Sequence, residues 1–233
     1  ETADGKKVML AANIGGADEA AKAVKDGAEG VGLFRTEFLF LNKNALPTEE
    51  EQFEEYKKAA VLTKGMPLTI RTLDIGGDKD IPYMGLTKEA NPFLGYRAIR
   101  FCLDRVDIFT TQLRAILRAS AYGSIRIMIP MITSVNEVRQ VKELIKKICS
   151  DLDRNGINYD KNIQTGIMIE TPAAAVMADT LAKEADFFSI GTNDLTQYTI
   201  AVDRCNENVA YLYSAFNPAV LRLIRRIIEC AHN

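Results

Sequence analysis

At 233 residues the chain is long enough to bury a full core as one domain, and ~250 residues is the usual size of an eight-stranded (β/α) barrel. Lys and Arg total 29 against 31 Asp and Glu, a net charge of −2 without long runs of like charge, which argues against nucleic acid as a partner. No apolar run approaches the ~20 residues that span a bilayer, so we expect a cytoplasmic protein without membrane insertion. The four cysteines lack CxxC spacing, which favours reduced thiols over a zinc site or disulfides.

Short apolar runs alternate with helical segments from end to end. Runs of this kind are typical of strands that are covered on both faces, and we expect them at residues 8–12, 30–34, 68–73, 126–130, 166–169 and 187–190. Capping-box patterns predict helix starts at Thr48 and Ser134, and Thr171 precedes a proline suited to the first helical position. A long excursion at residues 75–92 and a helical insertion to about Tyr122 follow the third strand.

This alternation predicts an α/β fold of the (β/α)8 TIM-barrel type, because parallel strands joined by helices tend to close into a barrel. Only about six of the eight strand-helix units are present, and the chain stops after a helix that begins near Pro218. We therefore expect one domain over residues 1–233, incomplete at its C-terminus. The chain does not begin with methionine, and we expect it to be a piece of a longer one. Phe101, Tyr122 and the face at residues 113–117 are expected in the core.

Two of the expected strands end in carboxylates. Glu170 follows the run Gly166–Ile169, and Asp194 follows Phe187–Ile190 within a few residues. Since the carboxyl ends of successive parallel strands lie at one rim, both side chains are expected in the same pocket. Two carboxylates together with a phosphate-bearing ligand suit Mg²⁺, which is usually held by one or two carboxylates and the substrate.

Arginines occur at the same strand ends. Arg35 ends the second strand, Arg71 lies in the third, and Arg204 comes after the helix that Asp194 opens. A guanidinium group can donate two parallel hydrogen bonds to one phosphate or carboxylate. These arginines and carboxylates together therefore predict a site for a small, strongly anionic ligand that binds with a metal. Any one of these residues has an ordinary alternative as a solvated or salt-bridged rim residue, and only their joint placement favours a site. Glu37 and Asp74 are expected to orient Arg35 and Arg71.

Longer strings surround these positions. They are GLFRTEFLF at 32–40, IRTLDIGGDK at 70–79, LGYRAIR at 94–100, IMIETPAAA at 167–175 and SIGTNDLTQYT at 189–199. In this order they resemble the phosphoenolpyruvate-binding domain of the enzyme I family, the phosphoenolpyruvate-protein phosphotransferases of bacterial sugar transport. The resemblance covers nearly the whole chain. Lys79 has no phosphate-loop motif around it and is interpreted as a surface lysine.

The resemblance implies a role for each site residue. Arg35 and Arg71 would hold the phosphoryl group, and Arg97 would lie near the phosphoryl group as it is transferred. Glu170 and Asp194 would bind Mg²⁺. Arg204, together with Asn193 and Asp194, would bind the carboxylate of phosphoenolpyruvate or pyruvate. Electrostatic stabilisation of this kind is what phosphoryl transfer requires of a protein.

The resemblance also implies partners. In the family the phosphoryl group passes to a histidine on a separate N-terminal domain and then to a small phosphocarrier protein, and the enzyme is expected to be a homodimer. Neither that histidine nor the family's acidic cysteine on a seventh strand has a counterpart here, so no catalytic residue is assigned to this chain. The sole histidine is His232, and Cys205 stands where the family usually has glycine. Alternatives are a phosphoenolpyruvate- or pyruvate-binding or dimerisation module without turnover, or a barrel like that of pyruvate phosphate dikinase.

Overall fold

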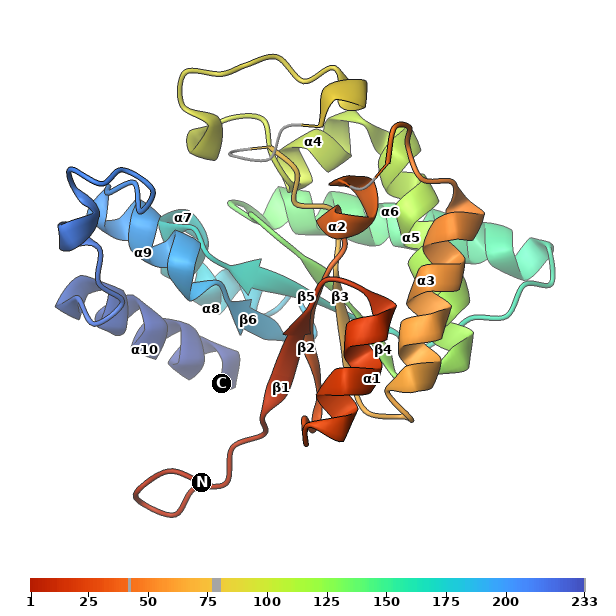
Figure 1. Cartoon of the computed structure of the whole chain (residues 1–233), viewed down its shortest axis with the longest axis horizontal. Helices are drawn as coiled ribbons and strands as arrows, with labels where there is room; N and C mark the ends of the chain where they lie inside the picture. The colour runs from red at the N-terminus through yellow and green to blue at the C-terminus, as the bar shows by residue number, and fades with distance from the viewer. Residues whose placement is uncertain (42, 77–80, 233) are drawn as a thin grey trace.

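Six parallel strands form one sheet whose order follows the chain, β1-β2-β3-β4-β5-β6 (Figure 1). The computed structural model describes residues 1–41, 43–76 and 81–232, without the side chain of Pro82. Residues 77–80, which include Lys79, lie outside the described part. The strands are β1 (Ala11–Ile14), β2 (Gly30–Arg35), β3 (Leu68–Arg71), β4 (Ile125–Ile129), β5 (Gln164–Ile169) and β6 (Phe188–Ile190).

Helices follow every strand of this sheet. They are α1 (Ala17–Lys25), α2 (Glu37–Leu41), α3 (Glu49–Leu62), α4 (Ile99–Asp104), α5 (Val106–Ala119), α6 (Val135–Arg154), α7 (Pro172–Val176), α8 (Ala178–Leu181), α9 (Thr192–Ile200) and α10 (Pro218–His232). Short 3₁₀ turns lie at η1 (Pro82–Met84), η2 (Pro92–Leu94), η3 (Ser120–Tyr122) and η4 (Ala210–Leu212). In Figure 1 helices α1, α3 and α5 lie on one side of the strands and α9 and α10 on the other.

The sheet is a curled half-barrel with its carboxyl ends at one rim, which confirms the predicted fold class. Each neighbouring pair of strands is parallel, and β1 and β6 are the two edges of the described sheet. The excursion after β3 passes over this rim before α4 begins (Figure 1). The rim therefore gathers the residues that follow every strand, together with the excursion.

The predicted helix starts are confirmed. The Thr48 hydroxyl accepts the Glu51 amide at 3.2 Å, and the Glu51 carboxylate accepts the Thr48 amide at 2.8 Å. Ser134 caps α6 in the same reciprocal way. Thr171 caps α7 through the Ala174 amide at 3.1 Å. Each contact satisfies a backbone N–H that the first helical turn leaves without an acceptor.

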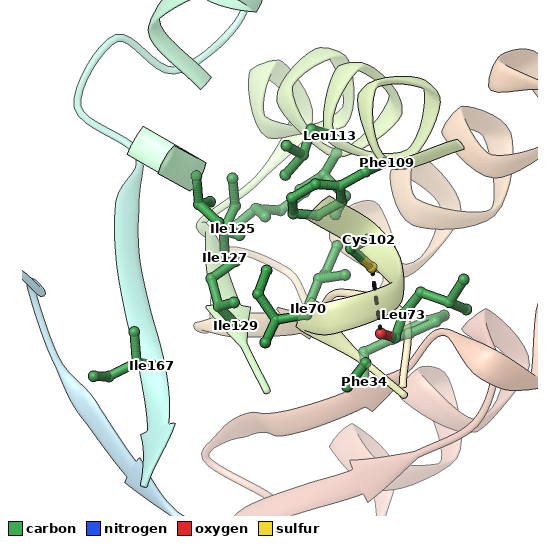
Figure 2. Close-up of a cluster of buried hydrophobic side chains, with 14 of the residues drawn as sticks. Phe34, Ile70, Leu73, Cys102, Phe109, Leu113, Ile125, Ile127, Ile129 and Ile167 are labelled. Atoms are coloured by element: carbon green, nitrogen blue, oxygen red, sulfur yellow. Dashed lines mark hydrogen bonds between the residues drawn. The ribbon is translucent and has the colours of Figure 1, made fainter. Parts of the chain in front are cut away.

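The core lies between the sheet and α5. Ile70 and Ile127 on neighbouring strands pack against Phe109 and Leu113 of that helix, and all four are almost fully buried (Figure 2). Burial of each such side chain stabilises the fold by roughly 1.5–3 kcal/mol. This packing fixes the ends of β3 and β4, on which part of the rim is built.

A buried, uncharged cluster also holds the ends of β2 and β3; we call it the glutamine cluster, comprising Gln112, Thr36, Tyr56 and Gln52. Gln112 on α5 accepts the Leu73 amide at 2.9 Å and donates to the Thr36 hydroxyl at 3.1 Å. Thr36 in turn donates to the backbone oxygen of Arg71 at 2.9 Å. Gln112 also donates to the Tyr56 hydroxyl, which donates to Gln52. The backbone that follows the Arg71 side chain is thereby fixed from within the core.

Two expectations about burial are wrong. The first strand was expected at residues 8–12 but begins at Ala11, and Val8, Met9 and Leu10 are 54%, 56% and 71% exposed. Their apolar pattern resembles a strand, but no described element covers them. Tyr122 is 49% exposed because η3 lies at the surface, where only one side of its ring meets Phe53. Phe101, Leu113, Ile116 and Leu117 are in the core as expected.

Candidate ligand-binding site

A cavity of about 490 Å³ lies at the carboxyl-end rim. Its lining comes from the ends of β1, β2, β3, β5 and β6, from α2, from Phe93 and Arg97 ahead of α4, and from the start of α9. All seven site residues predicted from the sequence line it, namely Arg35, Arg71, Arg97, Glu170, Asn193, Asp194 and Arg204. The structure therefore brings together residues spread over most of the chain.

Arg35 and Arg71 lie side by side because β2 and β3 pair with these two residues in register. Arg71 is buried and forms ion pairs with Glu37 at 2.7 Å and Asp74 at 3.2 Å. Burial alone would lower the pKa of Arg71, but Asp74 and Glu37 raise it above its ordinary value. Its charge is therefore permanent.

Arg35 differs from its neighbour. Its guanidinium lies over the Phe38 ring, 4.6 Å from the centroid, and within the described residues it forms no ion pair with a carboxylate. Glu37 was expected to orient Arg35, but the structure places Glu37 on Arg71 instead, because Glu37 begins α2 and that helix turns it toward β3. The Nε atoms of Arg35 and Arg71 are both buried without a hydrogen-bond partner among the described residues. Two cations thus line one cavity, a favourable setting for an anion.

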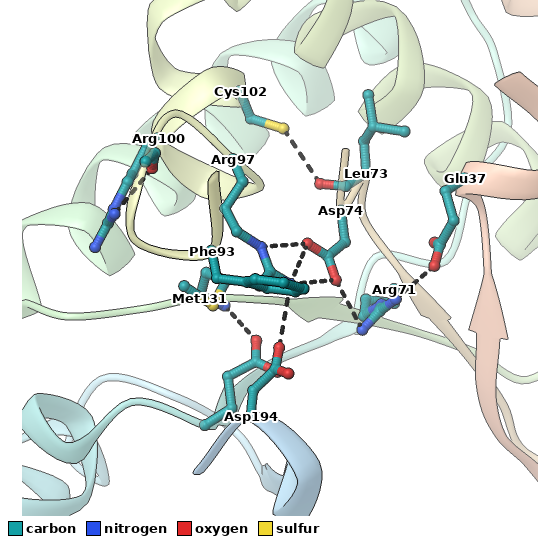
Figure 3. Close-up of polar contacts among 12 residues, drawn as sticks. Glu37, Arg71, Leu73, Asp74, Phe93, Arg97, Arg100, Cys102, Met131 and Asp194 are labelled. Carbon is teal, nitrogen blue, oxygen red and sulfur yellow. Dashed lines mark hydrogen bonds and ion pairs between the residues drawn. The ribbon is translucent and has the colours of Figure 1, made fainter. Parts of the chain in front are cut away.

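Arg97 crosses the cavity wall between two carboxylates (Figure 3). It contacts Asp74 at 3.0 Å and Asp194 at 3.1 Å, joining the segment after β3 to the start of α9. Gly76 permits this arrangement, since it has φ +105° and a Cβ there would lie 2.5 Å from the Cβ of Arg97. We call Arg71, Asp74, Arg97, Glu170 and Asp194 the charged cluster.

The first turn of α9 supplies the opposite wall. Asp194 lies in that turn and also accepts from Arg204 at 2.9 Å. Asn193 is exposed, and the Tyr213 hydroxyl lies 3.2 Å from its backbone oxygen. The first N–H groups of a helix have no acceptor within the helix and carry partial positive charge. This end of the cavity therefore suits a carboxylate as well as a phosphate.

Glu170 is almost fully buried in the cavity wall, at 2% exposed. One oxygen accepts the Met131 amide at 2.6 Å, and the other packs against Gly191, where a Cβ would lie 2.7 Å from it. Met131 has φ +59°, a conformation that side chains other than glycine rarely adopt and that functional sites often hold. Burial raises the pKa of Glu170 to about 8, helped by the charges of Asp74 and Asp194 and opposed by Arg71.

The donors at this rim fit a hard divalent cation. Glu170 and Asp194 line the same cavity, and the raised pKa of Glu170 means that added positive charge would favour its ionised form. No group of three or more His, Cys, Asp or Glu side chains within the described ranges is arranged to hold a metal ion. A magnesium ion here would have two protein carboxylates and would take its other oxygens from ligand and water. Asp194 would share its oxygens with Arg97 and Arg204.

Sequence reasoning missed three contributors to the site. Met131 supplies an amide, Gly191 supplies space, and Tyr198 supplies a hydroxyl that contacts Arg97 at 3.1 Å. Only Tyr198 left a signal that could have been used, since it lies four residues after Asp194 and hence on the same face of a helix.

The fold and the site define a parallel α/β barrel-type domain whose rim carries both arginines and carboxylates. The chain matches the family described as PEP-utilising enzyme, PEP-binding domain, over residues 1–233, and it belongs to that family. This confirms the family resemblance that the sequence strings indicated. Within the described residues no helix is both long enough and apolar enough to cross a membrane.

Curated relatives named phosphoenolpyruvate-protein phosphotransferase are closely similar. The chain is 58% identical over 231 residues to that of Geobacillus stearothermophilus, and 56% identical to that of Buchnera aphidicola subsp. Acyrthosiphon pisum. It is 55% identical over 229 residues to that of Bacillus subtilis. These matches cover 98–99% of this chain but only 40% of each relative, so the chain spans less than half of their length.

Solved structures support the fold alone. A crystal structure of the citrate synthase SbnG aligns with a TM-score of 0.54 at 12% identity, covering 93% of this chain and 69% of that one. A citrate lyase from Burkholderia xenovorans LB400 aligns with a TM-score of 0.51 at 15% identity, covering 92% of this chain and 56% of that one. At such identities the likeness concerns the barrel architecture and not the chemistry.

Proposed function

We propose that residues 1–233 act as one Mg²⁺-dependent phosphoenolpyruvate-binding domain of a phosphoenolpyruvate-protein phosphotransferase. The observation that carries this proposal is the rim cavity that four arginines line together with Glu170 and Asp194. Phosphoenolpyruvate carries a phosphoryl group and a carboxylate, which such a set of charges can bind at separate ends. The names of the relatives support the same ligand.

Each residue has a proposed role. Arg35 and Arg71, adjacent in register, bind the phosphoryl group, for which two neighbouring guanidinium groups are suited. Arg204 and the first turn of α9 at Asn193 bind the carboxylate. Arg97 lies beside the phosphoryl group in transfer. Neutralising the equatorial oxygens is the main task in phosphoryl transfer, and preorganised charges perform it without rearranging.

The metal would be held by Glu170 and Asp194 and would draw charge from the phosphoryl oxygens. The acceptor would be a histidine of a separate N-terminal domain, which passes the phosphoryl group to a small carrier protein in the cytoplasm for sugar uptake. We further propose that the protein works as a homodimer. These partners rest on the family resemblance and on the names of the relatives.

We also propose that this chain by itself binds phosphoenolpyruvate without turning it over. Its only histidine, His232, lies in the last turn of α10, exposed and away from the cavity lining. Phosphoryl transfer requires an acceptor in line with the leaving oxygen. Incubation with phosphoenolpyruvate and Mg²⁺ should therefore release no pyruvate. Steady pyruvate release would contradict this part of the proposal.

Calorimetric titration tests the binding site. We expect phosphoenolpyruvate to bind weakly without Mg²⁺ and much more tightly with it, because ligand and carboxylates complete the metal's coordination together. Glu170→Gln and Asp194→Asn should each remove the dependence on Mg²⁺. Glu143→Gln, at an exposed position of α6, is the matched control and should retain it. Equal Mg²⁺ dependence in all three variants would contradict the metal site, and no binding by the unmodified chain would contradict the function.

A further inference from the structure

Tyr198 lies one turn after Asp194 on α9, so both side chains leave the helix on the same face and meet Arg97. Asp194 contacts the Nη2 atom of Arg97 at 3.1 Å, and the Tyr198 hydroxyl contacts its Nη1 atom at 3.1 Å. The helix thus holds two branches of one guanidinium. Tyr198 is half-buried and does not itself line the cavity.

The donors of Arg97 can be assigned one by one, since a guanidinium carries five N–H groups in a fixed plane. Its Nε atom donates to Asp74, and its Nη2 atom donates to Asp74 and Asp194. Its Nη1 atom donates to Tyr198. The second N–H of Nη1 has no acceptor among the described residues and is the donor left for a ligand. Tyr198, together with Asp74 and Asp194, therefore holds in place the branch that carries the remaining donor.

The hydroxyl proton of Tyr198 is already used in a hydrogen bond. The hydroxyl donates to the backbone oxygen of Phe93, in η2 of the excursion, so its lone pair is left to accept from Arg97. Burial raises the pKa of Tyr198, so the proton stays in place at neutral pH. The Phe93 ring lies 5.8 Å from the guanidinium and lines the cavity (Figure 3). One hydroxyl thus joins α9, the excursion and Arg97.

We propose that Tyr198 is a positioning residue for phosphoenolpyruvate, acting through Arg97, whose free Nη1 donor it aims at the phosphoryl group. The inference rests on the proposed function, because it takes the phosphoryl group as the ligand of Arg97. It makes a selective prediction. A ligand with a phosphoryl group should depend on Tyr198, whereas pyruvate, which has the carboxylate alone, should not.

The test is calorimetry of Tyr198→Phe with phosphoenolpyruvate and with pyruvate, each in the presence of Mg²⁺. The phenyl ring preserves packing and removes only the hydroxyl. We expect about tenfold weaker binding of phosphoenolpyruvate, the usual effect of losing a hydrogen bond to a charged group, and less than twofold change for pyruvate. Tyr83→Phe is the matched control, since Tyr83 also fastens the excursion by a hydroxyl, to the Phe40 backbone oxygen at 2.7 Å, but contacts no arginine. It should leave both affinities unchanged.

A double-mutant cycle separates positioning from a structural role. If Tyr198 acts through Arg97, adding Tyr198→Phe to Arg97→Lys should weaken phosphoenolpyruvate binding by less than threefold further. Additive losses, or equal weakening of pyruvate and phosphoenolpyruvate in Tyr198→Phe, would overturn the inference while leaving the proposed function intact. Unchanged phosphoenolpyruvate binding in Tyr198→Phe would do the same. Failure of the unmodified chain to bind phosphoenolpyruvate would overturn both.

Discussion

The glutamine cluster and the charged cluster meet at the end of β3, yet they differ in how their polar groups are satisfied. In the glutamine cluster Gln112 accepts a hydrogen bond through its carbonyl oxygen and donates through its amide nitrogen. Thr36 and Tyr56 each donate their own hydroxyl proton to a further acceptor in the core. In the charged cluster the Nε atom of Arg71 lacks a partner within the described part of the chain, and Glu170 has a raised pKa. The first cluster is complete without a ligand, whereas the second is not.

This difference teaches that burial of polar groups serves two purposes here. A neutral network with every donor matched stabilises the backbone around Arg71 and leaves nothing to bind. A cluster of charges with unused donors is costly to maintain, and its cost falls when an anion and a cation enter. Changes in the first cluster should therefore affect stability, and changes in the second should affect binding.

The largest effect is expected from Gln112→Leu. This change leaves the buried Leu73 amide without its acceptor and removes the N–H group that donates to the Thr36 and Tyr56 hydroxyls. We expect a loss of about 3 kcal/mol in the free energy of unfolding, measured by urea denaturation, because each unsatisfied buried group costs about 1–3 kcal/mol. Gln140→Leu, at an exposed position of α6, should change stability by less than about 0.5 kcal/mol. A loss below 1 kcal/mol in Gln112→Leu would mean that the glutamine cluster does not hold the rim.

Arg71→Lys removes a guanidinium from the charged cluster and keeps the positive charge at that position. A lysine cannot present the two-pronged donor geometry of a guanidinium, so phosphoenolpyruvate should bind more than tenfold more weakly, about 1.5–3 kcal/mol. Arg139→Lys, which keeps a surface charge near Glu184, should leave the affinity unchanged. Calorimetry of the two variants decides the matter, and equal effects would show that the clamp is assigned to the wrong arginine.

The pH dependence of stability probes Glu170. The pKa of this carboxyl is 4.5 in the unfolded chain, and burial raises the pKa to about 8 in the folded protein. Between these values the folded state holds a proton that the unfolded state has released, so the free energy of unfolding should fall as pH rises. We expect a fall of roughly 1–2 kcal/mol from pH 5.5 to 7.5 without Mg²⁺.

Glu170→Gln should remove most of this slope, as measured by urea denaturation at several pH values, and Glu143→Gln should keep it. Parallel profiles for the original protein and Glu170→Gln would show that another group carries the pH dependence.

The smallest effect is expected from Cys205→Gly. The family resemblance suggested that a cysteine at a usual glycine position could strain the backbone beside Arg204. Cys205 is exposed and is not among the residues with positive φ, so that strain is absent. The substitution should change stability by a few tenths of a kcal/mol and the affinity for phosphoenolpyruvate by less than twofold. A tenfold change in affinity would reveal a constraint on Arg204 that the backbone does not display.

Most of the fold could be predicted from short sequence patterns. Capping boxes and short apolar runs depend on neighbouring residues, so the starts of α3, α6 and α7 and the positions of β2 to β6 followed from the sequence. The first strand was misplaced because hydrophobicity does not say what covers a segment, and residues 8–10 are uncovered.

That the site residues would lie close together could be predicted from the topology, since parallel strands end at one rim. The contacts among these residues could not be predicted. Glu37 reaches Arg71 rather than Arg35, and the Met131 amide reaches Glu170, through side-chain and backbone geometry that long-range packing decides. The Tyr198 contact joins residues 101 positions apart, which no local pattern reveals.

The Arg97 contacts have a consequence for the order of folding. Arg97 lies 23 residues from Asp74 but 97 from Asp194 in the chain, so the two ion pairs close loops of very different length. Short loops close at lower entropic cost, and contacts between distant residues slow folding. We expect the Asp74 side of Arg97 to form with β3 and α4, and the Asp194 side only after β4, β5 and β6 have joined the sheet. The capacity to bind an anion would then be among the last properties that the folding chain acquires.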